Sequence, residues 1–387
     1  MKNGWQTKKV SEIAKHSLGK MLDKAKNKGE PKPYLRNLNV RWFDFDLSDV
    51  LEMRFLPEEA ARYTAVKGDV LICEGGYPGR AAIWEQDEPI YFQKALHRVR
   101  FHEPERNKWF LYYLLSKDLD GSLKSHFNGA GIQHFTGEAL AQFEVPLPPL
   151  PEQQRIVGLL DAAFAGLATA KANAEKNLHN ARALFESHLQ SVFTQRGKGW
   201  VEKKLESLGA IRTGKRDANH QVENGPYPFY TCAFGQFRSP TFSFDGASII
   251  LPGNGANVGK VFFHDGKFEA YQRTYVVNEL SQSINPRFLY YCFSANWPGW
   301  IATKQFGSAT NYIVVGDLKA FPVPTPPLPV QEETVEQLES FTEETQRLAT
   351  LYTRKLAALE ALKKSLLHQA FTGQLSHPSH SHPILIP

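Results

Sequence analysis

The chain has 387 residues, of which 42% are hydrophobic, and this is enough to bury the cores of two or three domains. No apolar run approaches the roughly 20 residues that a membrane-spanning helix needs, and the opening MKNGWQTKKV lacks the apolar core of a signal peptide. The three cysteines are odd in number and lack metal-binding spacing, so we expect free thiols in a cytoplasmic protein without a membrane partner.

The net charge of +5 is unevenly distributed along the chain. Residues 1–150 carry a charge of +2, residues 151–195 are neutral, residues 196–329 carry +5 and residues 330–387 carry −2. The positive excess therefore lies in two separate segments. An excess of this size permits nucleic-acid binding but does not establish it.

The first 150 residues are predicted to form an α+β domain. Lys67–Ile72 has the pattern of a turn that enters a buried strand, and a glycine loop with Gly75, Gly76 and Gly79 follows it. Phe110–Tyr113 then favours a short amphipathic helix.

A lysine-rich loop near the start of this domain is a candidate for DNA contact. It holds Lys20, Lys24 and Lys26. Cations on a loop suit phosphate oxygens, which bind strongly but carry no sequence information. An ordinary solvated loop explains the pattern equally well.

The next stretch, Tyr34 to Asn37, carries residue types that read bases. Arginine grips guanine edges and asparagine grips adenine edges, each through two hydrogen bonds. Because Arg36 alternates with the apolar Leu35, we expect its side chain to point away from the core. Tyr34, Arg36 and Asn37 are therefore predicted DNA contacts, with an ordinary surface as the alternative.

A proline-rich clamp, Phe143–Pro151, ends the domain. Proline at alternate positions favours an extended strand that cannot pair on both sides. No proline occurs from residue 152 to 194, and apolar residues recur there at spacings of three and four, which is typical of a coiled-coil seam. A helix of about 43 residues would span roughly 64 Å.

The second half of the chain repeats the first. Phe321–Pro329 matches Phe143–Pro151 at seven of nine positions with an offset of 178, and Phe288–Tyr291 matches Phe110–Tyr113 at the same offset. Such a repeat decides the domain plan. Neither long helix can fold alone on one narrow apolar stripe, so we expect the two copies to pack together.

The repeat predicts an α+β protein with a pseudo-two-fold internal repeat. Two similar α/β domains are separated by two long antiparallel helices that form a coiled coil. The predicted segments are residues 1–150 for the first domain, 151–196 for the first helix, 197–329 for the second domain, 330–373 for the second helix and 374–387 for a disordered tail.

The second domain has its own set of candidate DNA contacts. Arg212, Lys215 and Arg216 form its densest basic cluster, and Tyr230 lies in the aromatic stretch that follows. Lys260 comes directly after the second glycine loop. These residues are predicted to contact DNA by the same reasoning as in the first domain.

A glutamine followed by a cation occurs at nearly the same place in both domains. Gln93-Lys94 and Gln272-Arg273 align within one residue of each other. This shared dipeptide is the best single indication of a base-reading surface. The alternative is a packed strand whose polar side chains bind backbone groups.

Taken together, these features resemble the DNA-specificity subunits of type I restriction-modification enzymes. The clamp Pro146–Gln153 followed by Ile156 and Val157, the G-D-V-L-I strand and the glycine loops carry the resemblance, which covers nearly the whole chain. The second clamp departs from the pattern, because Val330-Gln331-Glu332 stands where Pro-Glu-Gln is usual. This departure is expected to weaken the start of the second helix.

The resemblance implies two target-recognition domains, each reading one half of a bipartite site in double-stranded DNA. Since the loops of the two domains differ, we expect the two half-sites to differ as well. The family also implies methyltransferase (modification) subunits, usually two, docked on the helices, and a motor-nuclease (restriction) subunit. The helices would then set the spacer between the half-sites.

Two near-motifs for catalysis are set aside. Gly253–Gly259 lacks the spacing of a dinucleotide loop, and Asn285–Phe288 has Arg287 in place of the second proline of the adenine methyltransferase signature. The sequence shows no S-adenosylmethionine loop, Walker A lysine or acidic nuclease cluster. We therefore expect a non-catalytic subunit with no cofactor, no catalytic residues and no metal site. The alternative is a self-sufficient DNA-modifying enzyme with a degenerate active site.

Overall fold

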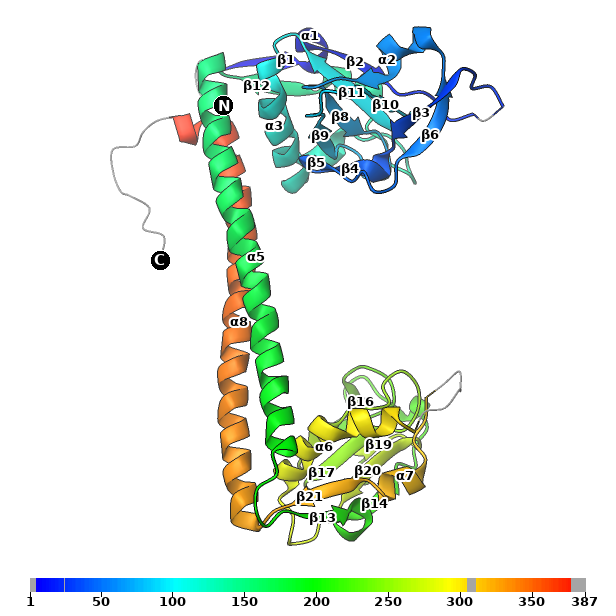
Figure 1. Cartoon of the computed structure of the whole chain (residues 1–387), viewed down its shortest axis with the longest axis vertical. Helices are drawn as coiled ribbons and strands as arrows, with labels where there is room; N and C mark the ends of the chain where they lie inside the picture. Colours follow the sequence, from blue (N-terminus) through cyan, green and yellow to red (C-terminus); the bar gives the residue numbers. More distant parts are fainter. Residues whose placement is uncertain (1–4, 24, 305–310, 377–387) are drawn as a thin grey trace. The chain divides into compact units, whose positions relative to one another are not determined.

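The computed structural model describes residues 5–23, 25–304 and 311–376. The chain forms two compact units, residues 1–173 with 355–387 and residues 174–354. Helices α5 (Leu150–Thr194) and α8 (Leu328–Thr372) contribute to both units (Figure 1). The tail from residue 377 onward, predicted to be disordered, lies outside the described residues.

Domain 1, residues 5–147 of the first unit, is built on two four-stranded sheets. The first is antiparallel, with the strand order β2 (Ala14–Leu18), β11 (Leu96–Phe101), β8 (Val70–Cys73) and β9 (Ala81–Ile83). The second has the order β6 (Leu51–Phe55), β3 (Glu30–Leu35), β10 (Ile90–Phe92) and β7 (Thr64–Ala65), and its β3–β10 pair is parallel. Two strand pairs complete the sheets: β1 (Gln6–Lys9) with β12 (Glu144–Leu147), and β4 (Val40–Arg41) with β5 (Asp44–Phe45). The α-helices are α1 (Val10–Ile13), α2 (Ala60–Tyr63), α3 (Asn107–Leu119) and α4 (Gly137–Gln142), and short 3-10 helices connect several of these elements.

Domain 2, residues 197–325 of the second unit, repeats this plan. Its antiparallel sheet has the order β14 (Ala210–Thr213), β20 (Thr274–Asn278), β17 (Ser248–Pro252) and β18 (Phe262–His264). Its second sheet has the order β16 (Phe237–Ser239), β15 (Tyr227–Tyr230) and β19 (Glu269–Ala270), and β15–β19 is the parallel pair. Strand β13 (Val201–Lys204) pairs with β21 (Pro322–Thr325). Helices α6 (Pro286–Ala302) and α7 (Val315–Lys319), both labelled in Figure 1, take the places of α3 and α4 in the order of elements.

The proline-rich clamps form the strands β12 and β21. Each pairs on one side only, with the first strand of its own domain. A buried glutamine then ties each clamp to its helix: the Nε2 of Gln153 donates to the carbonyl of Pro148, and that of Gln331 donates to the carbonyl of Pro326. Helix α8 starts at Leu328, the repeat position of Leu150 in α5, so the departure in the second clamp does not move the start of the helix. The buried glutamine amide makes the same hydrogen bond in both copies, although the residue before it is Glu152 in the first copy and Val330 in the second.

The end of α8 completes the core of domain 1. Leu367, Ala370 and Phe371 belong to the same buried cluster as α3 and the start of α5. The ring of Phe371 packs edge-on against Trp109 with centroids 4.7 Å apart. The indole N–H of Trp109 in turn donates to the carbonyl of Pro146 in the clamp, at 2.8 Å.

Domain 2 is completed in the same way by the end of α5. Leu189 and Phe193 join its buried cluster, together with Leu338 from the start of α8. Phe193 packs on Phe288 of α6 with ring centroids 5.3 Å apart. In each unit, therefore, the beginning of one long helix lies beside the end of the other. This confirms the predicted class of two similar α/β domains with antiparallel paired helices and an internal repeat.

His97 is a buried anchor in the core of domain 1. Its side chain lies on β11 with no exposed surface, and its Nε2–H donates to the carbonyl of Phe135, at 2.9 Å. The other ring nitrogen, Nδ1, is buried and has no partner in the described part of the chain. Burial lowers the pKa of His97 to about 4, and the nearby His16 acts in the same direction.

Domain 1 is therefore expected to lose stability as the pH falls from 6.5 toward 4. In this window the unfolded chain protonates His97 while the folded chain does not, so acid favours unfolding. The difference between the two pKa values corresponds to on the order of 3 kcal/mol. Denaturant titrations at several pH values should show this slope, and the His97→Gln variant should flatten it. The exposed His102→Gln variant is the control; equal slopes in wild type and His97→Gln would contradict the assignment.

Candidate nucleic-acid interface

Three loop segments meet beyond the end of β8 in domain 1. They are the glycine loop that begins at Glu74, the turn Gln93–Ala95 and the segment Asn128–Thr136 that precedes α4. The N–H of Glu74 donates to the carbonyl of Ala95 at 2.9 Å, and the N–H of Phe135 donates to the carbonyl of Glu74 at 2.8 Å. The glycine loop is thus held by backbone hydrogen bonds on both of its sides.

These segments surround an open hollow of about 680 Å³. Asn37, Gln93 and Lys94, three of the predicted contacts, line it together. The amide of Asn37 also donates to the carbonyl of Gly75, at 3.1 Å, which fixes its side chain against the glycine loop. The other polar side chains around the hollow are Glu74, Asn128, His134 and Thr136.

The equivalent segments of domain 2 have the same backbone frame. The N–H of Gly253 donates to the carbonyl of Arg273, and the N–H of Ile313 donates to the carbonyl of Gly253, both at 2.9 Å. The hydroxyl of Tyr275 donates to the carbonyl of Ile313, at 3.3 Å. Tyr275 therefore anchors this loop as His97 does in domain 1.

This frame fixes how the two glutamine–cation dipeptides align. The N–H of Gln93 donates to the carbonyl of Leu35, and that of Tyr271 donates to the carbonyl of Tyr230, at the ends of the parallel strands β3 and β15. Gln93 therefore corresponds to Tyr271. The dipeptide Gln272-Arg273 of domain 2 begins one residue later in its turn than Gln93-Lys94 does in domain 1. Both dipeptides therefore lie in the equivalent turn of their domain.

Three predicted contacts in domain 1 are engaged within the protein. Lys20 is 8% exposed, and its ammonium pairs with Glu59. Tyr34 is 1% exposed and packs in a cluster with Phe55. Arg36 binds the carboxylate of Asp49 at 2.6 Å. Lys20 and Tyr34 are therefore buried where the sequence analysis expected contact, and Arg36 is held by an acidic neighbour instead of projecting freely.

The rest of the lysine loop is only partly described. The side chain of Lys26 is 86% exposed and lies 3.6 Å from Asp23. Surface pairs of this kind contribute little to stability, so the charge of Lys26 remains accessible to a phosphate. Lys24 lies outside the described residues.

The basic cluster of domain 2 divides into paired and free cations. Arg212 binds Glu279 at 2.6 Å, and Arg216 lies 3.4 Å from the buried Glu269. Lys215, by contrast, is exposed, and no hydrogen bond or ion pair involves its side chain within the described ranges.

Gln272 and Arg273 are both exposed at the turn, and their side chains have no partner among the described residues. Lys260 lies 3.7 Å above the ring of Phe234, which is 71% exposed. Tyr230 is half-buried, and its hydroxyl lies 3.3 Å from His264. Among the predicted contacts of domain 2, Gln272, Arg273 and Lys260 are therefore exposed, as Lys215 is.

Sequence reasoning missed Glu74, Asn128, His134 and Thr136. Glu74 directly precedes the glycine pair, so the motif itself pointed to it. Asn128 and His134 form an isolated antiparallel bridge in a segment that no periodicity reveals. Only the fold brings that segment to the hollow.

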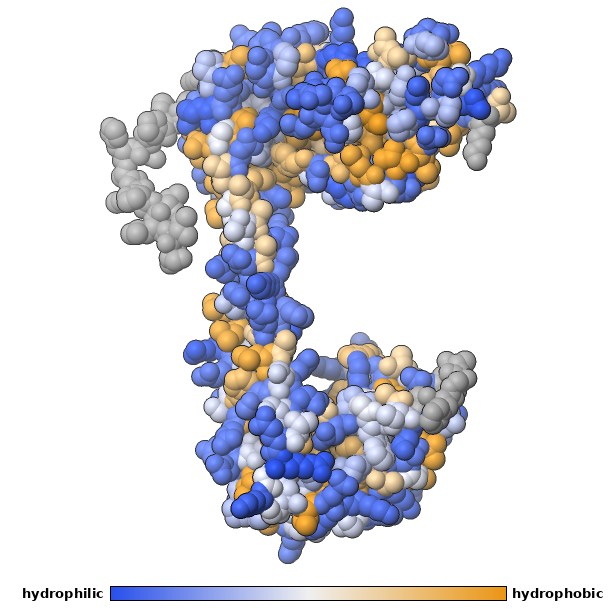
Figure 2. Space-filling model, in the orientation of Figure 1, coloured by the Kyte–Doolittle hydropathy of each residue, from blue (hydrophilic) through white to orange (hydrophobic). Residues whose placement is uncertain are grey.

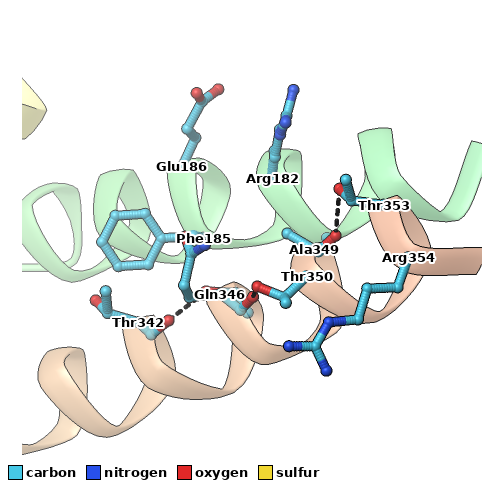
Figure 3. Close-up of a pocket in the computed structure, with 11 residues that line it drawn as sticks. Arg182, Phe185, Glu186, Thr342, Gln346, Ala349, Thr350, Thr353 and Arg354 are labelled. Atoms are coloured by element: carbon cyan, nitrogen blue, oxygen red, sulfur yellow. Dashed lines mark hydrogen bonds between the residues drawn. The ribbon is translucent and has the colours of Figure 1, made fainter. Parts of the chain in front are cut away.

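A second surface lies between the paired helices of the second unit. A groove of about 670 Å³ is lined by Phe185 and Arg182 of α5 and by Thr342, Ala349 and Thr350 of α8 (Figure 3). The threonine hydroxyls donate to carbonyls of their own helix, for example Thr350 to Gln346 at 2.8 Å. On the α8 side the groove therefore presents mainly alanine and threonine side chains, whereas α5 contributes the larger Phe185, Arg182 and Glu186.

Apolar patches interrupt a mainly hydrophilic surface on the visible face of the molecule (Figure 2). Among the large apolar side chains exposed on the helices of the second unit are Leu184, Leu348 and Leu351. Within the described residues, no group of three or more His, Cys, Asp and Glu side chains could hold a metal ion. None of the helices in the described ranges is long and apolar enough to cross a membrane.

Comparison with known proteins gives a consistent result. The type I restriction enzyme EcoDI specificity subunit of Escherichia coli is 31% identical over 177 residues, which is 46% of this chain but only 39% of the length of that relative. A chain from a study of complex assembly and conformational transition of the type I R-M system superposes with a TM-score of 0.79 at 19% identity, covering 96% of this chain and 98% of the other. The HsdS subunit from Thermoanaerobacter tengcongensis gives 0.63 at 18% identity, with coverage of 96% and 98%. At these identities the two structures establish the fold.

A family model decides the membership. The model for the type I restriction modification DNA specificity domain matches residues 2–177 and again residues 197–355. The two matches take in both domains and most of both long helices, as the internal repeat requires. These matches do not support the alternative of a self-sufficient DNA-modifying enzyme. The chain therefore belongs to the type I restriction modification DNA specificity family.

Proposed function

We propose that this chain is the non-catalytic, DNA-reading subunit of a type I restriction-modification complex. Each domain reads one half of a bipartite, asymmetric site in double-stranded DNA. The partners are methyltransferase subunits, two by the internal repeat, and a motor-nuclease subunit. The paired helices set the spacer and carry the methyltransferase subunits.

One observation carries the proposal. The same backbone frame occurs in both domains, yet it presents different side chains: Asn37, Gln93 and Lys94 in domain 1, and Gln272 and Arg273 in domain 2. A shared scaffold with divergent exposed groups suits two readings of one polymer. Asparagine, glutamine and arginine are the side chains that recognise base edges in the major groove.

Exposed cations in each domain supply sequence-independent attraction. Lys215 and Lys260 are exposed in domain 2, and Lys26 is exposed on the lysine loop of domain 1. Contacts to phosphates position a protein on the duplex, while contacts to bases give it specificity. The proposed contact surface omits Lys20 and Tyr34, because both are buried.

The groove of the second unit supports the docking of a methyltransferase helix. The small alanine and threonine side chains on its α8 side allow the close approach that packing of a third helix requires, and the ring of Phe185 offers apolar contact area. The exposed leucines on these helices add apolar surface that a partner would cover.

The proposal is tested by sequencing DNA methylation in cells that carry the chain together with its methyltransferase subunits. We expect a bipartite motif that disappears when this chain is removed. The purified chain alone should bind no S-adenosylmethionine in a calorimetric titration. A continuous or palindromic motif, or micromolar cofactor binding by the chain alone, would overturn the proposal.

Replacing Arg273 with alanine should relax one half-site and leave the other unchanged. If Arg273 grips a guanine, the loss of discrimination is about 1–3 kcal/mol. The control is Lys215→Ala, which should weaken binding to all sequences and reduce the salt dependence. Binding to cognate and random duplexes at several salt concentrations separates the two. Equal losses of affinity for the cognate and the random duplex would show that Arg273 contacts a phosphate and not a base.

Lengthening both helices should lengthen the spacer. The ion pair between Lys171 and Glu360 marks where the helices lie side by side in the first unit. Four residues inserted after Lys171 and four after Glu360 lengthen each helix by about 6 Å. Because four residues are close to one helical turn, the apolar stripe of each helix still faces the other helix. At 3.4 Å per base pair, methylome sequencing should show a spacer about one or two base pairs longer. An unchanged spacer would show that the helices do not set it.

Filling the groove should weaken the attachment of a methyltransferase subunit. Thr350→Arg places a long charged side chain in the groove without touching the buried core. The matched control is Gln337→Arg, which adds the same charge on α8 outside the groove lining. Co-purification with the methyltransferase should fall about tenfold or more for Thr350→Arg alone. Equal recovery of both variants would place the docking surface elsewhere.

A further inference from the structure

Among the described residues that line the hollow of domain 1, Glu74 is the one carboxylate. It lines the space together with Lys94, His134 and Asn37. Hydrogen bonds through its own N–H and carbonyl fix its backbone to the neighbouring segments. Its side chain is half-buried, and no hydrogen bond or ion pair engages the carboxylate within the described part of the chain. A side chain held this way is presented from a rigid support to whatever enters the hollow.

A carboxylate on a DNA-binding face has few favourable positions. Facing a phosphate it is repelled, and the effect grows as water is excluded. Facing a base edge, it accepts a hydrogen bond from the exocyclic amino group of cytosine, N4, or of adenine, N6. The neighbouring Lys94 supplies the cation that a phosphate prefers. The carboxylate of Glu74 is therefore suited to a base and not to the backbone.

Domain 2 cannot make the same contact. Its structural counterpart to Glu74 is Gly253, which shares the same two backbone hydrogen bonds. A Cβ at Gly253 would lie 2.1 Å from the carbonyl oxygen of Arg273 and 3.1 Å from the ring of Tyr275. No side chain fits there without a shift of the backbone. The two faces therefore differ in a hydrogen-bond acceptor at one defined place.

We propose that Glu74 is a specificity-determining residue that accepts a hydrogen bond from an exocyclic amino group of one base, cytosine N4 or adenine N6, in the half-site read by domain 1. The inference rests on the proposed function, because it assumes that the hollow faces DNA. It names the residue that reads one base, its role as a hydrogen-bond acceptor and the amino group that it recognises. It also assigns one recognised position to domain 1 that has no equivalent in domain 2.

The first experiment compares methylomes of cells that carry the chain with its methyltransferase subunits. Glu74→Ala should make one position of one half-site degenerate. Because glutamine pairs with N6 and N7 of adenine, Glu74→Gln should change that position to adenine if the wild type reads cytosine there and should keep it if the wild type reads adenine. The control is Glu85→Ala, an exposed carboxylate of domain 1 outside the hollow, which should leave the motif unchanged. A motif that is unaltered in both Glu74 variants would overturn the inference, as would changes in both half-sites.

The second experiment removes the amino group from the DNA. At the position that Glu74→Ala alters, the duplex is rebuilt with pyrimidin-2-one for cytosine or with unsubstituted purine for adenine. Binding by the wild-type complex should fall roughly tenfold for the analogue of the recognised base, and the Glu74→Ala complex should show no further loss. The two analogues distinguish cytosine from adenine. Equal losses in wild type and variant would show that Glu74 does not bind the amino group.

Failure of the inference can be told apart from failure of the proposed function. If the wild-type complex gives no bipartite motif, the proposed function is wrong and the inference falls with it. If the wild type gives that motif and the Glu74 variants retain it unchanged, only the role of Glu74 is wrong.

Discussion

The core of each domain is closed by the final turns of a long helix. In domain 1, Phe371 at the end of α8 packs on Trp109, which also binds the clamp. In domain 2, Phe193 at the end of α5 packs on Phe288. Burial of an aromatic ring is among the larger single contributions to a core. Because the same helices also form the coiled coil, the stability of the domains and the pairing of the helices cannot be separated. A register shift between the helices would withdraw these rings from the cores they complete.

The two domains show how a fixed frame supports different contacts. The antiparallel sheet, the parallel pair in the second sheet and the anchored loop recur in both. Even the anchor varies in chemistry, because His97 and Tyr275 bind the same carbonyl position with an imidazole and a phenol. The side chains that differ between the two domains lie at the ends of the loops, where they do not pack in the core. Glu74 and Gly253 are an exception: there the backbone of domain 2 excludes any side chain.

The repeat made the fold predictable, because an offset of 178 residues relates strands, helices and clamps that pack alike. Asn37, Gln93 and Lys94 were also found from residue type, and the fold brings them together. Arg36 shows the limit of alternation: β3 ends at Leu35, a short 3-10 helix follows, and the period of two no longer applies. The partner of Lys20 is Glu59, 39 residues away, and no local pattern reveals such a pair. The role of Glu74 depends on three segments that meet only in the folded domain.

The exchange of helix ends also sets an order of events during synthesis. The core of domain 2 includes Phe193 and Leu338. Phe193 is synthesised before domain 2, and Leu338 follows a few helical turns after the last strand of domain 2, β21. Domain 1 needs Phe371, which is made about 220 residues after its last strand. At 5–20 residues per second, this gap is roughly 10–45 s. During that time the apolar face around Trp109 lacks the ring of Phe371. The domain that is translated first is thus the last to be finished.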